Sequence, residues 1–66
     1  MHTGKKIKML RTLRSLSQEE LAEKISKTRA LVSHIEQTGK VNHYTLMMIL
    51  KVLKVTEAYF EKFEEG

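Results

Sequence analysis

The apolar positions along the chain recur at helical spacing and predict an all-α fold. In each segment they return every three or four residues, and no alternating pattern typical of a β-strand continues for more than a few positions. The breaks between segments fall at residues that commonly begin or end helices. We expect five helices in one domain of residues 1–66, over residues 4–14, 18–25, 29–37, 43–53 and 57–64.

Residues with short polar side chains precede several of these helices. Ser17 stands three positions before Glu20, the spacing of a capping box, in which each side chain accepts a hydrogen bond from the other residue's backbone amide. The later helices each follow a residue suited to the N-cap, namely Thr28, Asn42 and Thr56.

Residues 16–40 predict two short helices joined by a break of about three residues. On the second helix Val32 and Ile35 form an inward stripe, and Gly39 is placed to end it. The other face is small, polar and free of acidic residues, and it carries Arg29, Ala30, Ser33, His34 and Gln37. Two helices joined by a tight turn, the second with such a face, meet the requirements for placing one helix in a DNA major groove.

This segment also resembles the lambda-repressor and Cro type of helix-turn-helix, also called the xenobiotic-response-element type. Two motifs at the correct separation carry the resemblance: Leu16, Ser17, Gln18, Leu21 and Ala22, followed by Ser33, Ile35, Glu36 and Gly39. The similarity extends from about Gly4 to Phe60. It implies a compact five-helix lambda-repressor-like DNA-binding domain with the helix-turn-helix at its second and third helices.

Candidate DNA contacts divide by the chemistry of their side chains. Arg29 can bind guanine through paired donors, Ser33 can serve a base or a phosphate, and Ala30 can contact a thymine methyl group, with His34 and Gln37 as further candidates. Phosphate contacts are expected from Gln18, Lys27, Thr28 and Lys40. The resemblance implies DNA contacts at Gln18, Thr28, Arg29, Ala30, Ser33 and His34, and a backbone contact at Lys40.

Three positions depart from the family pattern. Ser26 stands where the family usually has a turn glycine with positive φ, and Lys27 stands where an apolar turn residue is common. Leu31 replaces a residue that is usually polar, and we expect it to be half exposed or to press against a partner or the sugar backbone.

The first helix carries an arginine at the edge of its apolar stripe. Ile7, Leu10 and Leu13 form that stripe, and Arg11 lies about 40° from Ile7, where a partly buried guanidinium needs a carboxylate. Glu36 is the candidate, because proteins that this sequence resembles often pair an Arg and a Glu at these positions. The alternative is that Glu36 is only a surface residue.

The last two helices carry more apolar surface than one small core needs. The aromatic stripe of Tyr59, Phe60 and Phe63 either covers the core of the monomer or belongs to a two-fold interface. The candidate dimer interface consists of Met47, Met48, Val52, Tyr59 and Phe63.

The net charge of +4 is unevenly distributed. Residues 1–40 hold nine Lys or Arg and four Glu, a balance of +5, whereas residues 41–66 hold three Lys and four Glu, a balance of −1. A basic front half fits a polyanion bound on one side, although a merely solvated basic surface is the alternative. Most cationic side chains of the first helix are expected only to keep its exposed face hydrated and not to bind phosphate.

Composition argues against other classes of function. The chain has no Cys, and its three histidines have no carboxylate at ligand spacing, so we expect no metal and no cofactor. No catalytic arrangement or Gly-rich phosphate loop is recognisable. Without a signal peptide or an apolar run of about 18 residues, the protein is expected in the cytoplasm and not in a membrane.

These observations favour a dimeric, sequence-specific regulator of transcription, most simply a repressor, that binds double-stranded DNA at a pseudo-palindromic operator. The rival hypothesis is a protein-interaction module of the same fold, such as an antitoxin or an anti-repressor, which the surplus apolar surface supports. An enzyme has almost no support in the sequence.

Overall fold

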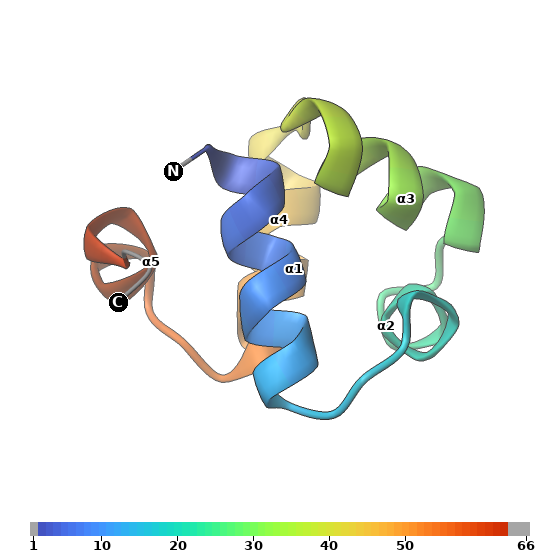
Figure 1. Ribbon diagram of the computed structural model, residues 1–66, viewed down its shortest axis with the longest axis horizontal. Helices are drawn as coiled ribbons and strands as arrows, with labels where there is room; N and C mark the ends of the chain where they lie inside the picture. The colour runs from blue at the N-terminus through green and yellow to red at the C-terminus, as the bar shows by residue number, and fades with distance from the viewer. Residues whose placement is uncertain (1, 64–66) are drawn as a thin grey trace.

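The computed structural model describes residues 2–63, which form five α-helices and no β-strand (Figure 1). The prediction of an all-α, five-helix fold is therefore confirmed. The helices are α1 (Thr3–Leu13), α2 (Gln18–Lys24), α3 (Arg29–Thr38), α4 (His43–Leu53) and α5 (Glu57–Lys62).

The predicted helix boundaries differ from the observed ones at several ends. α1 begins one residue early, because the Nδ1 atom of His2 accepts a hydrogen bond from the Gly4 amide at 3.0 Å and caps the helix. α1 and α2 each end one residue early, and α3 extends one residue further. α5 stops at Lys62, since Phe63 has an extended backbone with φ −66° and ψ 124°, and the predicted end at residue 64 lies outside the described residues.

Local hydrogen bonds fix where four of the helices begin. The Ser17 hydroxyl accepts from the Glu20 amide at 3.0 Å, and the Glu20 carboxylate accepts from the Ser17 amide at 2.8 Å, which completes the predicted capping box. Each of the three other predicted N-caps accepts a hydrogen bond from the amide three residues later: Thr28, Asn42 and Thr56.

The turn between α2 and α3 keeps the backbone conformation of a glycine although its residue is serine. Ser26 has a φ of 57°, in the left-handed region. This conformation costs a residue with a Cβ roughly 1–2 kcal/mol relative to its preferred regions. The amide of Lys27 donates to the Ala22 carbonyl at 2.9 Å and closes the turn. The substitution therefore leaves the turn in place at a cost in stability.

A single apolar core holds the helices together. Every helix contributes to it, and its fully buried side chains include Ile7, Leu21, Val32, Ile35, Ile49 and Leu53. Leu13, placed in the core stripe by the sequence, is 69% exposed, so that assignment was wrong. Three-residue steps drift by about 60° around a helix, which puts Leu13 about 120° away from Ile7.

α1 is the central support of the fold, because it contacts both α3 and α5 (Figure 1). Gly4 allows the backbones of α1 and α3 to touch, since a Cβ there would overlap the carbonyl oxygens of Ile35 and Glu36. On the other side of α1, the ammonium of Lys6 donates to the carbonyls of Phe60 and Glu61, at 3.0 Å each.

α5 covers part of the monomer core. Phe60 is only 4% exposed and belongs to the buried cluster, and the Lys6 ammonium lies 5.3 Å from the centre of its ring. The Tyr59 side chain lies outside this buried cluster and is 52% exposed. The aromatic stripe is therefore divided, with Phe60 in the core and Tyr59 on the surface.

Candidate nucleic-acid interface

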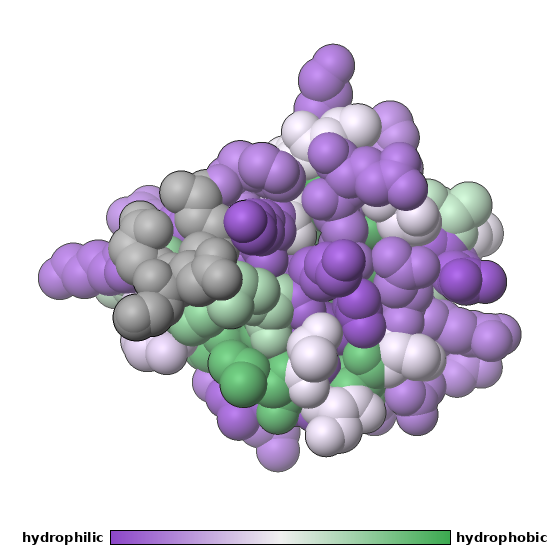
Figure 2. All heavy atoms as spheres, in the orientation of Figure 1, coloured by the Kyte–Doolittle hydropathy of each residue, from purple (hydrophilic) through white to green (hydrophobic). Residues whose placement is uncertain are grey.

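The outward face of α3 carries the polar side chains that the sequence assigned to it. Arg29, Ala30, His34 and Gln37 are exposed and Ser33 is half-buried, whereas Val32 and Ile35 on the opposite side are buried. The Gln37 amide donates to the Ser33 hydroxyl at 3.3 Å, so these two side chains lie together on the face. Most side chains around α3 in Figure 2 are hydrophilic.

The outward face of α3 carries no acidic side chain, because the only carboxylate of this helix is turned inward. Glu36 is 8% exposed, and its carboxylate forms an ion pair with the Arg11 guanidinium, in which Nε lies 2.7 Å from Oε2. A second hydrogen bond runs from Nη2 of Arg11 to Oε1 at 3.1 Å, which makes the pair bidentate. The two residues paired by sequence reasoning are thus paired in the structure, and they join α1 to α3.

The same carboxylate also holds the start of α2. The amide nitrogen of Gln18 donates to Oε1 of Glu36 at 3.1 Å, and Arg11 donates from Nη1 to the Leu16 carbonyl at 2.7 Å. Because a buried charge needs every available partner, these bonds compensate the burial of Glu36 and Arg11. They also link the start of α2 to α3 at a point separate from the turn at Ser26.

Gln18 therefore has a structural role that sequence reasoning missed. Its side chain is half-buried, and one amide hydrogen is directed at Glu36. A side-chain amide has two N–H donors, so the second remains available for a phosphate. This role depends on the hydrogen bond from Gln18 to Glu36, which is 18 residues further along the chain, so the sequence around Gln18 gives no signal for it.

Two lysines lie beside the two ends of α3. Lys27 and Lys40 are exposed and line the same hollow, of about 410 Å³, together with Leu31 and Asn42. Leu31 is half-buried and packs against the core. Thr28 is exposed, and its hydroxyl oxygen accepts from the Leu31 amide at 3.1 Å, which leaves its hydrogen free to donate. Lys27 and Thr28 therefore lie just before the start of α3, and Lys40 lies just after its end.

The apolar residues suggested for a dimer interface are more covered than the sequence indicated. Met47, Met48 and Val52 are half-buried and pack against the core of their own chain. Phe63 is likewise half-buried and packs against the core, whereas Tyr59 is exposed, and their ring centroids are 5.9 Å apart. The largest exposed apolar side chains also include Leu13 and Tyr44, which sequence reasoning did not single out as exposed.

The described residues show neither a metal site nor a membrane span. Within residues 2–63 no group of three His, Asp or Glu side chains is arranged to hold a metal ion. Over the same residues no helix has the length and apolar character needed to cross a membrane.

Two comparisons with known proteins bear on this geometry. A family model described as Helix-turn-helix matches residues 7–60, which include α2, α3 and the turn between them. A search of curated proteins found no match to the chain.

Proposed function

The chain belongs to the lambda-repressor and Cro type of the helix-turn-helix family, a family of DNA-binding proteins, and from this premise we propose that it is a sequence-specific regulator of transcription. The observation that carries the proposal is the outward face of α3, where Arg29, Ala30 and His34 are exposed while Glu36 is buried in its ion pair. A helix whose exposed surface bears donors and no carboxylate can approach a duplex without repelling its phosphates.

In the proposed complex α3 enters the major groove and its side chains contact base edges. Arg29, the first residue of the helix, binds a guanine through two donors, and Ala30 contacts a thymine methyl group. Ser33, His34 and Gln37 lie further along the same face. Because Gln37 already donates to Ser33, these two residues would act together on neighbouring bases or on a base and a phosphate.

The phosphates on either side are bound by Gln18, Lys27, Thr28 and Lys40. The second amide hydrogen of Gln18 and the hydroxyl of Thr28 donate to phosphate oxygens near the starts of α2 and α3. Lys27 and Lys40 supply the positive charge, and they release counterions when they bind. Affinity therefore depends on salt, whereas sequence choice depends on α3.

The protein is proposed to act as a dimer on a pseudo-palindromic operator. Two copies of α3 would then reach successive major grooves about 34 Å apart on one side of the duplex. The interface would include Met47, Met48, Val52, Tyr59 and Phe63, of which Tyr59 has the most exposed surface to bury. Repression in the cytoplasm, by covering a promoter, is the simplest output of such binding.

An experiment with a random-sequence duplex pool tests the proposal. The full chain should enrich related sequences with two half-sites, and the Arg29→Ala, Ser33→Ala double variant should lose at least tenfold in affinity for them, while its helicity and oligomeric state stay unchanged. The matched control Lys8→Ala, Lys62→Ala alters exposed residues away from α3 and should bind within about twofold of the parent chain.

Salt dependence provides a second criterion. Two lysines per subunit give four charged phosphate contacts per dimer, so affinity should fall on the order of 100-fold between 50 and 200 mM salt. Binding that does not weaken with salt would refute the phosphate-dominated mechanism. An unchanged affinity of the Arg29→Ala, Ser33→Ala variant would instead favour the rival hypothesis of a protein-interaction module, such as an antitoxin or an anti-repressor. The exposed side chains of Leu13 and Tyr59 support that hypothesis.

A further inference from the structure

Two open grooves meet at the end of the molecule where α1 and α4 finish, away from α3 (Figure 1). The first, of about 610 Å³, lies between α1 and the start of α5, and the second, of about 500 Å³, lies between α4 and the segment that leads into α2. Arg14 and Lys54 line both grooves, so the two form one continuous surface around these cations.

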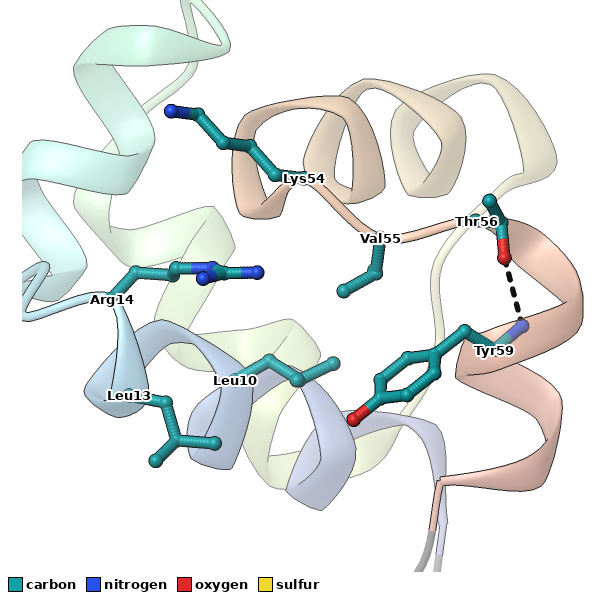
Figure 3. A pocket seen from close by; sticks show the side chains of 7 residues that line it. All are labelled: Leu10, Leu13, Arg14, Lys54, Val55, Thr56 and Tyr59. Atoms are coloured by element: carbon teal, nitrogen blue, oxygen red, sulfur yellow. Dashed lines mark hydrogen bonds between the residues drawn. The ribbon is translucent and has the colours of Figure 1, made fainter.

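The first groove combines an apolar wall with this cationic edge. Figure 3 shows Leu10, Leu13, Val55 and Tyr59 around the hollow, with the Arg14 guanidinium directed into it. Leu13 is 69% exposed and Tyr59 is 52% exposed, so much apolar surface there is in contact with water. Figure 2 shows hydrophobic side chains gathered near the lower part of α1. An exposed apolar hollow edged by charge is typical of a site that binds a partner.

The second groove adds positive charge and no negative charge. Lys24 and Lys51 line it beside the half-buried Leu16 and Val52, and none of the described residues that line either groove is acidic. Four cationic side chains therefore surround a surface that also exposes apolar side chains. The complementary partner carries carboxylates next to apolar side chains.

Arg14 is held in position to receive a carboxylate. Its Nε donates to the Leu53 carbonyl at 2.7 Å, which anchors the guanidinium at the end of α4. Within the described part of the chain its remaining four donors have no hydrogen-bond partner, and a guanidinium fixed on one edge presents its other edge for a bidentate contact. Lys54, at the C-cap of α4, lies next to it on the same rim.

We propose that this surface is a docking site for an acidic segment of another protein, which places an apolar side chain between Leu13 and Tyr59 and a carboxylate on Arg14. The site lies apart from α3 but shares Tyr59 and Val52 with the proposed dimer interface, so a partner bound there would compete with a second copy of the chain. The docking proposal does not depend on the proposed function. Nucleic acid fits less well, because phosphates gain nothing from the apolar wall and Tyr59 is the only aromatic residue among the described residues that line the two grooves. A two-fold contact centred on Arg14 and Lys54 fits less well too, since it would bring the cations of both subunits together.

The test is a selection of random 12-residue peptides on the full chain. Enriched peptides should carry Asp or Glu beside Leu, Phe or similar residues, and the Arg14→Glu, Lys54→Glu variant should bind them at least tenfold more weakly. The matched control Lys8→Glu, Lys62→Glu makes the same change in net charge outside both grooves and should bind within about twofold of the parent chain.

Arg14→Glu removes the hydrogen bond to Leu53, so a loss of peptide binding could come from a folding defect. A second variant distinguishes the two causes. Leu13→Ser with Lys54→Glu touches no side-chain hydrogen bond of the described residues and should also lose at least tenfold in peptide affinity while its melting temperature is unchanged. Selection of neutral or basic peptides, no enrichment, or equal binding by these variants and the control would overturn the proposal. A change of oligomeric mass in the variants would also overturn it, because it would assign the surface to a second copy of the chain. Displacement of the bound peptides by single-stranded DNA would overturn it as well.

Discussion

Two residues in this protein carry an energetic cost in the folded state, and neighbouring side chains compensate only one of the two costs. Glu36 is a buried carboxylate whose side chain is 3% exposed, and it is stabilised by Arg11 and Gln18. Ser26 holds a φ of 57° that suits glycine better. The first cost is compensated by contacts from two other helices, whereas the second is borne locally, so substitutions at the two sites should have opposite effects.

Replacing Glu36 with Gln should lower the free energy of unfolding by about 3 kcal/mol. The change leaves the guanidinium of Arg11, 11% exposed in its side chain, without a counter-charge. Urea denaturation measures the effect, and Glu23→Gln, at an exposed position of α2, should change stability by less than about 0.5 kcal/mol. A loss below 1 kcal/mol for Glu36→Gln would show that the pair contributes little.

Replacing Ser26 with Gly should raise the free energy of unfolding by about 0.5–1 kcal/mol. Glycine adopts positive φ without steric cost, and this gain exceeds the extra entropy of the unfolded chain. Ser33→Gly, inside α3, is the contrasting control and should lower stability by a similar amount. A Ser26→Gly chain that is less stable than its parent in the same denaturation would contradict the argument.

At the level of the helices, this fold depends on how closely pairs of helices approach and on how each helix is capped. α1 meets α3 at Gly4, where the two backbones leave no space for a Cβ. α2 begins with a reciprocal pair of hydrogen bonds between Ser17 and Glu20. The first feature sets how closely α3 approaches α1, and the second fixes where α2 begins.

Gly4→Ala should destabilise the protein by about 2–3 kcal/mol, although alanine favours helix formation. The added methyl group would overlap the backbone of α3, so α1 must shift and the packing of Ile7 beneath it must loosen. Thermal unfolding followed by circular dichroism measures the loss. Lys8→Ala, at an exposed position of the same helix, should leave the melting temperature nearly unchanged.

The capping box should make α2 sensitive to acid. The backbone amide of Ser17, and secondarily its side chain, holds the pKa of the Glu20 carboxyl below the ordinary value of 4.5. A lowered pKa in the folded state means that the contribution of Glu20 is complete above about pH 4.5 and is lost as pH falls through the folded value. Glu20→Gln should therefore flatten the fall in melting temperature below pH 4.5, whereas Glu19→Gln should not. Identical pH profiles for the Glu20 variant and the parent chain would exclude this role.

In the molecule as a whole, the exposed surfaces separate into distinct regions. The polar face of α3 lies at one end, the cationic grooves at the ends of α1 and α4 lie at the other, and Tyr59 borders the first of those grooves (Figure 1). The core inside is apolar apart from Thr45 and the paired Glu36 among the buried residues described. Because the surfaces share few residues, variants can alter one and leave the others intact.

Tyr59→Glu tests the proposed dimer at this scale. The side chain is 52% exposed, so the monomer should remain folded, while a carboxylate in an apolar two-fold contact should shift the protein towards monomer and weaken operator binding by at least tenfold. Sedimentation and DNA titration measure the two effects. Leu13→Ser, at a comparably exposed position outside the proposed dimer interface, should change neither. Retention of the dimer in the Tyr59 variant would remove this residue from the interface.

The sequence by itself determined the helices, their caps and the polar face of α3. Ser17, Thr28, Asn42 and Thr56 each form a hydrogen bond with a residue three positions away, and such short-range contacts can be read from spacing. The outward position of Arg29 likewise follows from helical periodicity.

Only the tertiary structure decided which of these helices touch and what each side chain meets. Three such contacts join residues 18 or more positions apart. They are the contact between Gly4 and α3, the hydrogen bond from Gln18 to Glu36 and the hydrogen bond from Arg14 to Leu53. Leu13 has an apolar side chain in a helical pattern, yet it is 69% exposed because it lies about 120° around α1 from Ile7, on a side that the other described helices leave open to solvent. Local patterns set conformation, whereas burial depends on which distant segments fold against a residue.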